Sequence, residues 1–189
     1  MCIRDRNNGV HHLYINVEQV RAFRTCSFFI SCEPPLILGG LKLNRSVLKF
    51  GGSSVSDFTK IKNIAEMLKT RVEQGEELIV VVSAMGKTTD QLMENVSTLT
   101  STPKDQELAL LLTTGEQQTV SYLSMVLNDI GVKAKAMTGY QAGIKTIGHH
   151  LKSKIAEINP DTFNQAFENN DVLVVAGFQG INDEFELTT

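Results

Sequence analysis

The fold is indicated first by a continuous apolar run, Leu78-Ile79-Val80-Val81-Val82. The small and polar residues Ser83-Ala84-Met85-Gly86 follow it. A continuous run of mostly β-branched apolar residues predicts a strand that is covered on both faces. The small and polar residues after it end the strand and open a loop. The same pattern returns at residues 171–176, Asp-Val-Leu-Val-Val-Ala, which end at Gly177. Two buried strands with loops at their carboxyl ends are therefore predicted.

Helices are predicted between the strands. Apolar residues three and four apart predict a helix that begins at a cap, Ser56 or Asp57, and ends near Glu73. Further helices are predicted at residues 89–99, at 104–130 with an interruption at Thr113-Thr114-Gly115, and from Pro160 onward. Shorter strands are predicted at residues 47–50 and 132–137, and residues 152–158 stay unassigned. This alternation predicts an α/β fold, a three-layer sandwich with a mainly parallel sheet between layers of helices.

Composition and charge exclude several classes of protein. The 189 residues are 42% hydrophobic, enough for a core, and their net charge of −3 argues against a general nucleic-acid-binding surface. No apolar run reaches the roughly 18 residues of a membrane-spanning helix, so we expect no membrane partner. All three cysteines precede residue 45, and the cysteine-free remainder is typical of a cytoplasmic protein.

Residues 1–45 differ from the rest of the chain. They carry six Lys and Arg against three Asp and Glu, whereas residues 46–189 carry twelve against eighteen. They do not combine an apolar stretch with the small-residue cleavage site that a signal peptide requires. We therefore divide the chain into a leader that is disordered or non-native and has no assigned function, and an organised domain at residues 46–189.

The loops at the strand ends form the candidate site, because ligands of parallel sheets bind at the carboxyl ends of the strands. Gly51-Gly52-Ser53-Ser54 precedes a helix, which is a typical arrangement for binding an anion through backbone N–H groups. An ordinary strand-to-helix turn is the alternative. Lys49 lies in the apolar strand just before this loop. A lysine in such a position usually lies at an edge or on the surface, whereas in a covered strand its charge would need an anionic partner such as phosphate.

Two familiar nucleotide-binding motifs do not fit. Gly86-Lys87-Thr88-Thr89 resembles the end of a P-loop, but Val81 stands where that motif needs a glycine. Neither Gly51-Gly52 nor Gly177-Phe178-Gln179-Gly180 follows the Gly-x-Gly-x-x-Gly pattern of dinucleotide-binding folds. No metal site is predicted, because His149-His150 has no further ligand nearby and a closed zinc site needs four ligands.

Five blocks, in order, resemble the aspartate kinases of the amino-acid kinase superfamily. They are Lys49 to Ser54, Val80 to Asp90, Thr113 to Gln117, Gly139 to Ile144 and Ala176 to Gly180. The resemblance covers residues 46–189 and corresponds to the N-terminal part of the kinase domain only. It implies ATP-dependent phosphorylation of the side-chain carboxylate of L-aspartate to 4-phospho-L-aspartate, the first step towards lysine, threonine and methionine. It also implies that full-length members are homo-oligomers.

The resemblance assigns the phosphate side of the site. Lys49 contacts the transferring phosphoryl group, and Gly51 and Gly52 supply N–H donors, which makes these three the catalytic candidates. Phe50 and Ser53 complete the ATP-binding set, and the implied cofactors are ATP and the Mg²⁺ that the nucleotide carries. The chemistry agrees, because an aspartate side chain with a pKa near ~3.9 is ionised at neutral pH. The reaction then needs charge neutralisation and positioning rather than a general base.

The resemblance also assigns the substrate side. Thr89, Glu116, Phe178 and Ser83 are the substrate-binding candidates, with Glu116 pairing with the ammonium group of aspartate. Simpler alternatives exist: Thr89 as the N-cap of the second helix, Glu116 as a charge that favours a helix start, and Phe178 as a core residue.

The chain ends at Thr189, before the Leu-Gly-Arg-Gly-Gly-Ser-Asp that follows in the family. We therefore expect a fold truncated at its C-terminus, with an open sheet edge and little kinase activity from this chain alone. Two other functions stay open. One is another amino-acid kinase of the glutamate or acetylglutamate type, and the other is a non-catalytic phosphate-binding fragment.

Overall fold

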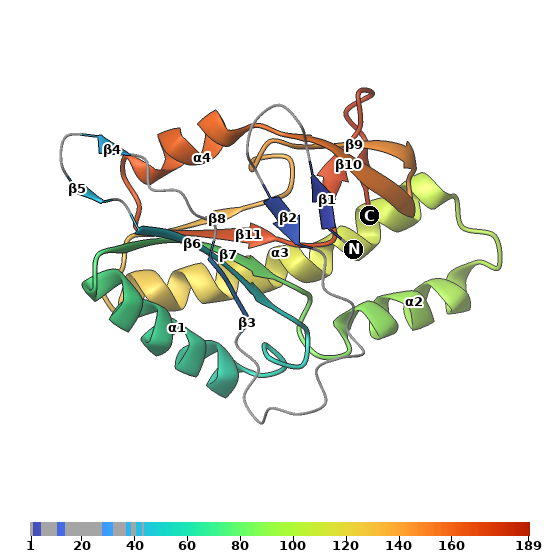
Figure 1. The fold of residues 1–189 in the computed structure, drawn as a ribbon. Helices are drawn as coiled ribbons and strands as arrows, with labels where there is room; N and C mark the ends of the chain where they lie inside the picture. Colours follow the sequence, from blue (N-terminus) through green and yellow to red (C-terminus); the bar gives the residue numbers. More distant parts are fainter. Residues whose placement is uncertain (1, 5–10, 14–27, 32–36, 39–40, 43) are drawn as a thin grey trace.

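The main sheet of the chain has five strands in the order β3-β6-β7-β11-β8 (Figure 1). Strands β6, β7, β11 and β8 are parallel to their neighbours, and only the edge strand β3 runs antiparallel, against β6. The mainly parallel sheet predicted from the apolar runs is thus confirmed. The strands are β3 (Phe28–Ser31), β6 (Asn44–Phe50), β7 (Glu76–Val82), β8 (Ala134–Met137) and β11 (Val172–Ala176).

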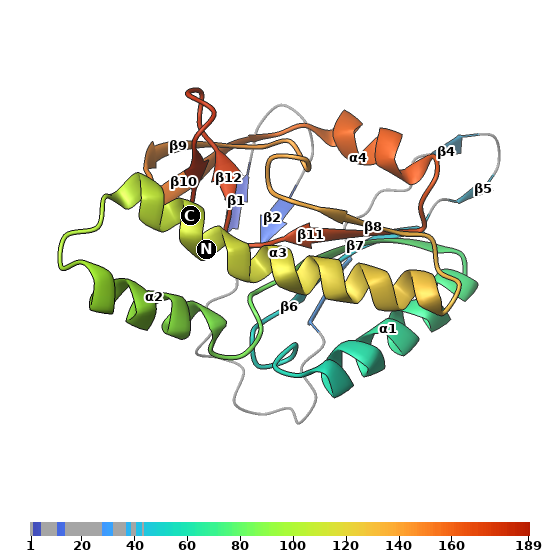
Figure 2. The same ribbon diagram turned by 180° about the vertical axis from the view of Figure 1, so that it is seen from behind.

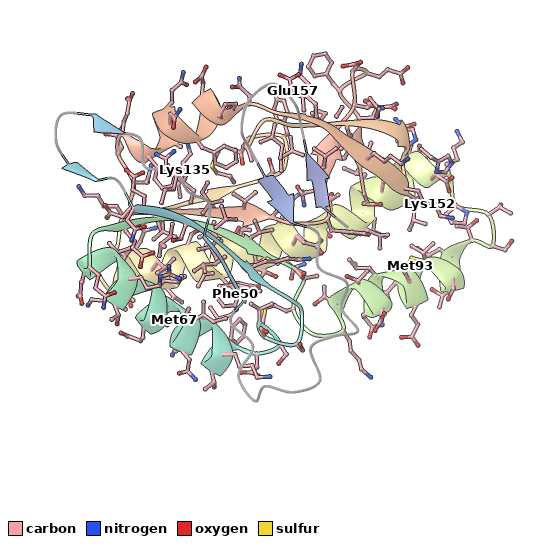
Figure 3. The ribbon with its side chains drawn as sticks, viewed as in Figure 1. Phe50, Met67, Met93, Lys135, Lys152 and Glu157 are labelled. Carbon is pink, nitrogen blue, oxygen red and sulfur yellow. The ribbon has the colours of Figure 1, made fainter. Side chains whose placement is uncertain are left out.

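Helices cover both faces of this sheet, as the three-layer prediction requires. Helices α1 (Phe58–Glu73) and α3 (Asp105–Asp129) lie on one face, and α4 (Pro160–Phe167) lies on the other (Figures 1 and 2). The larger core, which includes Phe50 and has Met67 packed at its margin (Figure 3), fills the space between the sheet, α1 and α3. A smaller core around Phe163 and Phe167 lies under α4. Within residues 44–189, no helix has both the length and the apolar character to cross a membrane.

Helix α2 (Thr88–Leu99) stands apart from these layers and contributes no buried residue to a core. It begins one residue before the predicted start, and an open loop at residues 100–104, which contains the predicted turn Ser101-Thr102-Pro103, connects it to α3 (Figure 2). An open apolar cavity of about 430 Å³ lies between the two helices, lined by residues that include Leu99, Pro103 and Leu108.

Helix α3 is continuous, so the predicted interruption at Thr113-Thr114-Gly115 is wrong. The two threonine hydroxyls donate hydrogen bonds to the carbonyl groups of Leu110 and Leu111, which lets polar residues stay inside the helix. A side chain at Gly115 would bring its Cβ within 2.9 Å of the Cβ of Ala84. The glycine therefore marks a close approach of α3 to the loop after β7 rather than a break.

A second, four-stranded sheet was not predicted. Its order is β10-β9-β12-β13, and it consists of β9 (Ile144–His149), β10 (Lys152–Ile158), β12 (Gly180–Ile181) and β13 (Leu187–Thr188). Strands β9 and β10 form an antiparallel hairpin, so the unassigned residues 152–158 are a strand. Most of the hairpin side chains are exposed, including Ile147 and Ile155. The sequence therefore lacks the regular alternation of apolar and polar residues that predicts a half-buried strand.

The structure is a computed structural model that describes residues 44–189. Before residue 44 it describes only the backbone of β3 and of four shorter strands. These strands are β1 (Cys2–Arg4), β2 (His11–Leu13), β4 (Ile37–Leu38) and β5 (Leu41–Lys42). The leader prediction for residues 1–45 therefore falls mostly outside the described residues. Asn44 and Arg45, which we assigned to the leader, are part of β6. Arg45 donates hydrogen bonds to Glu77, and its guanidinium lies 4.3 Å from the ring centre of Phe167.

Candidate active site

The carboxyl ends of three parallel strands meet, as the sequence predicted. After β6 and β7, the Ser83 N–H donates to the Phe50 carbonyl at 3.1 Å, and the Gly86 N–H donates to the Gly52 carbonyl at 3.1 Å. After β11, the Gly177 N–H donates to the Val82 carbonyl at 2.9 Å. The three loops that follow these strands are thus hydrogen-bonded into one surface, where ligands of parallel sheets bind.

The glycine loop packs tightly against the loop after β7. A Cβ added to Gly52 would lie 2.9 Å from the Ala84 carbonyl oxygen, so only glycine allows this approach. Gly51 differs, because nothing lies within 4 Å of a Cβ at that position. The Ser54 N–H donates to the Gly51 carbonyl at 2.9 Å and closes the turn, and Ser53 is exposed. The loop therefore offers an open face at Gly51 and a packed face at Gly52.

Lys49 is exposed, which agrees with surface placement and corrects the other expectation, that it lies in a strand covered on both faces. Strand β6 alternates: Leu48 and Phe50 point into the core on the α1 side, and Lys49 points to the other face beside Val81. Its ammonium is solvated and forms no ion pair with residues 44–189, so burial does not demand an anionic partner. The side chain of Phe50 is buried, which leaves only its backbone for the site.

Glu116 is the buried charge of the site. Its side chain is only 3% exposed, and its Oε1 accepts a hydrogen bond from the Ala84 N–H at 3.1 Å. Its Oε2 is buried without a hydrogen-bond partner among the described residues. Burial raises the pKa of this carboxyl above its ordinary value, although the Ala84 N–H partly offsets the effect. A buried oxygen without a partner is an unsatisfied acceptor that a cationic donor would fill.

Glu116 does not lie at a helix start, so the alternative of a charge favouring a helix terminus is wrong. Thr89 is not the N-cap of α2 either, because the helix begins at Thr88 with Lys87 at the cap position. Thr89 and Ser83 are half-buried near the strand-end loops. Phe178 is 54% exposed, which excludes the core alternative, and its φ of 57° is unusual for an aromatic residue.

Gln179 is a feature of the site that the sequence did not reveal. It is buried, its Oε1 accepts from the Gly139 N–H at 3.2 Å, and its Nε2 donates to the Thr113 carbonyl at 3.1 Å. The available signal was a polar residue in the segment Gly177-Phe178-Gln179-Gly180, which follows a buried strand. Its partners could not be inferred, because they come from two other parts of the chain.

The two adjacent histidines each contact a different carboxylate. His149 Nε2 lies 2.9 Å from Asp105 Oδ2, and His150 Nε2 lies 2.7 Å from Glu186 Oε2. The predicted turn is present, with His150 in it, but it is anchored by carboxylates from α3 and from the segment before β13. Residues 44–189 contain no group of three or more His, Cys, Asp or Glu side chains that could hold a metal ion.

Comparison with known proteins agrees with this architecture. Aspartokinase 2 of Bacillus subtilis is 41% identical over 143 residues, and an aspartokinase of Thermus thermophilus is 43% identical over the same length. An aspartate kinase structure from Synechocystis aligns with a TM-score of 0.61 and 38% identity over 76% of this chain and 23% of its own. Escherichia coli aspartokinase III in complex with aspartate and ADP, 16% identical, shares the fold with a TM-score of 0.61 over 75% of this chain and 42% of its own.

The chain spans about a third of the length of the curated relatives it matches, with 76% of this chain and 35% of the Bacillus subtilis protein aligned. The amino acid kinase family itself matches residues 44–188, which begins at the first residue of β6 and includes every strand-end loop described above. On this match, the chain belongs to the amino acid kinase family.

Proposed function

We propose that the protein carrying this chain phosphorylates the side-chain carboxylate of L-aspartate with ATP. The observation that carries the proposal is the buried Oε2 of Glu116, which has no partner among the described residues and lies on the helix that contacts the strand-end loops. A substrate ammonium would supply the missing donor and neutralise the buried charge. Relatives about 40% identical that are named aspartokinase support aspartate as that substrate.

The same oxygen favours a free amino acid over an acetylated one. An N-acetyl group has no positive charge, so it would leave the Glu116 carboxylate uncompensated in its buried setting. This argues against the acetylglutamate type of kinase. It does not separate aspartate from glutamate, and here the names of the relatives support aspartate.

On the phosphate side, ATP would lie over the open face of the loop at Gly51, where no atom would obstruct even an added Cβ. The exposed Lys49 ammonium can reach solvent-side phosphate oxygens without first breaking an ion pair to residues 44–189. In the reaction, a carboxylate oxygen of aspartate bonds to the γ-phosphorus while the bond from that phosphorus to the ADP oxygen breaks. Both partners are anions, so the ammonium and the loop N–H groups would lower the repulsion.

Magnesium is expected to arrive on the nucleotide phosphates. Residues 44–189 contain no cluster of three or more His, Cys, Asp or Glu side chains that could bind the ion. We therefore assign magnesium binding to the nucleotide and to no side chain of these residues. Assembly into homo-oligomers also belongs to this proposal, because it follows from the family and not from a surface of this chain.

The proposal is tested by isothermal titration calorimetry on the 189-residue chain with ATP and Mg²⁺, then with L-aspartate, L-glutamate and N-acetyl-L-glutamate. We expect L-aspartate to bind most tightly and the acetylated compound not to bind. Lys49→Ala should weaken ATP binding about tenfold without lowering the melting temperature, because the side chain is exposed. Lys135→Ala is the matched control, since Lys135 is an exposed lysine on another strand of the same sheet (Figure 3).

Each outcome bears on a different alternative. Preference for glutamate would replace aspartate as the substrate within the same family. Binding of ATP or inorganic phosphate without any amino acid would favour the non-catalytic phosphate-binding fragment. Equal ATP affinity of the Lys49 and Lys135 variants would refute the phosphate role of Lys49.

A further inference from the structure

Gln179 is a buried polar side chain that the chemistry above does not use. Its amide joins three segments: its own loop after β11, the loop after β8 through the Gly139 N–H, and helix α3 through the Thr113 carbonyl. Only one orientation of the amide satisfies both partners, because Gly139 offers a donor and Thr113 an acceptor. The bridge is therefore specific in its geometry as well as in its partners.

The bridge connects segments that carry two candidate substrate residues, Phe178 and Glu116. Phe178, directly before Gln179, has a φ of 57°, a left-handed conformation that a bulky residue keeps only where its surroundings impose it. Thr113 lies one helical turn before Glu116 on α3. A side chain at Gly139 would collide with the backbone of Gln179, so the loop after β8 packs directly on this segment.

We propose that Gln179 is a positioning residue of the substrate site. Its amide holds the Phe178 ring and the Glu116 carboxylate at a fixed separation, by tying the loop that carries one to the helix that carries the other. The inference rests on the proposed function, since it takes these two residues as the substrate side. Gln179 itself touches neither substrate nor phosphate.

Two substitutions test the bridge. Gln179→Met keeps the length of the side chain but removes both hydrogen bonds, which leaves the buried Gly139 N–H without a partner. Gln179→Glu keeps the acceptor and loses the donor when ionised, but a protonated carboxyl both accepts and donates, as the amide does. The matched control is Gln141→Met, because Gln141 is an exposed glutamine that accepts the Thr138 N–H at 2.9 Å in the same loop.

The first measurement is amide hydrogen exchange of the 189-residue chain, and the second is its affinity for L-aspartate and for ATP. We expect Gln179→Met to lower the protection of the Gly139 amide about tenfold and to weaken L-aspartate binding about tenfold, with ATP binding unchanged. At pH 8, Gln179→Glu should weaken L-aspartate binding as Gln179→Met does, because the ionised carboxylate cannot donate to the Thr113 carbonyl, but it should keep the protection of the Gly139 amide because it still accepts that N–H. Near pH 5 its affinity for L-aspartate should approach the wild-type value measured at the same pH. Burial raises the pKa of such a carboxyl and brings its protonation into that range.

The results separate a positioning role from a purely structural one. Equal loss of L-aspartate and ATP binding, or no recovery of Gln179→Glu at low pH, would overturn the proposal. Unchanged protection of the Gly139 amide in Gln179→Met would overturn it as well, whatever the ligands do. If the wild-type chain binds ATP but no L-aspartate, the proposed function fails for this chain, and the exchange data alone then decide whether the bridge exists.

Discussion

Replacing Glu116 by glutamine should change stability and substrate binding in opposite directions. The amide oxygen can still accept the Ala84 N–H in place of Oε1, and the amide nitrogen takes the place of the unpartnered Oε2, so the change removes the buried charge. A buried polar atom without a partner costs about 1–3 kcal/mol, and more when it is charged. The neutral amide carries a smaller penalty, so the melting temperature should stay the same or rise by a few degrees, at about 2–4 °C per kcal/mol for a chain of this size.

The stability difference should depend on pH in a defined direction. Burial raises the pKa of the Glu116 carboxyl above its ordinary value of 4.5, so the folded state binds the proton more tightly than the unfolded state. Ionisation of Glu116 then lowers the free energy of unfolding as the pH rises from 4.5 through the raised pKa. The glutamine variant lacks this loss. Its advantage should be absent near pH 4 and present at pH 8.

Binding should move the other way. A hydrogen bond to a charged group contributes about 1.5–3 kcal/mol, so losing the ammonium–carboxylate contact should weaken L-aspartate binding about 10- to 150-fold. Succinate, which lacks the ammonium, should lose no affinity. Glu107→Gln on the exposed side of the same helix is the control and should change neither quantity. A variant that is destabilised and still binds L-aspartate as tightly as the wild type would refute a substrate role for Glu116.

Two further substitutions test the framework around the site by thermal melts. Gly52→Ala should lower the free energy of unfolding by about 1–3 kcal/mol, because its Cβ would lie 2.9 Å from the Ala84 carbonyl oxygen. Gly51→Ala should not lower it, because nothing lies within 4 Å of a Cβ there. Equal effects of the two substitutions would contradict this packing. Glu76→Gln should cost about 1–3 kcal/mol at pH 7, because it breaks a mostly buried pair with Arg71, while Glu157→Gln in an exposed pair (Figure 3) should cost less than about 0.5 kcal/mol. Hydrogen bonding to Arg71 lowers the pKa of Glu76 below 4.5. The contribution of Glu76 to the free energy of unfolding should therefore persist above pH 4.5 and decrease as the pH falls through the lowered pKa. A stability difference between wild type and Glu76→Gln that grows in acid would be inconsistent with the pair.

The parallel sheet was predictable because its central strands are apolar on both faces. Residues 78–82 and 172–176 are runs that few other structures can accommodate, and β11 is indeed buried throughout. The second sheet was not predictable in the same way. Strands β9 and β10 pair with each other, and β9 also pairs with β12, while most of the side chains of β9 and β10 face solvent. Pairing between segments distant in sequence leaves little trace in local composition.

The misreading of Lys49 has a similar cause. Its apolar neighbours on β6 suggested a strand covered on both faces, but Leu48 and Phe50 belong to one face only, and period-two alternation places Lys49 on the other. The residue types of the substrate side came from the resemblance to aspartate kinases. The orphan oxygen of Glu116 and the bridge made by Gln179 could not be predicted, because each depends on atoms that tertiary packing brings together.

Ala84 explains why α3 keeps a glycine in the middle of 25 helical residues. Glycine in a helix interior costs about 1 kcal/mol relative to alanine, so stability alone would favour a side chain at Gly115. That side chain would meet Ala84, whose N–H holds Glu116 and whose carbonyl packs against Gly52. Pushing α3 away would separate the buried carboxylate from the glycine loop, which are the amino-acid side and the phosphate side of the proposed site. Helix α3 is thus less stable at Gly115 than it would be with alanine, and in exchange it packs closely against the loop that joins the amino-acid side to the phosphate side.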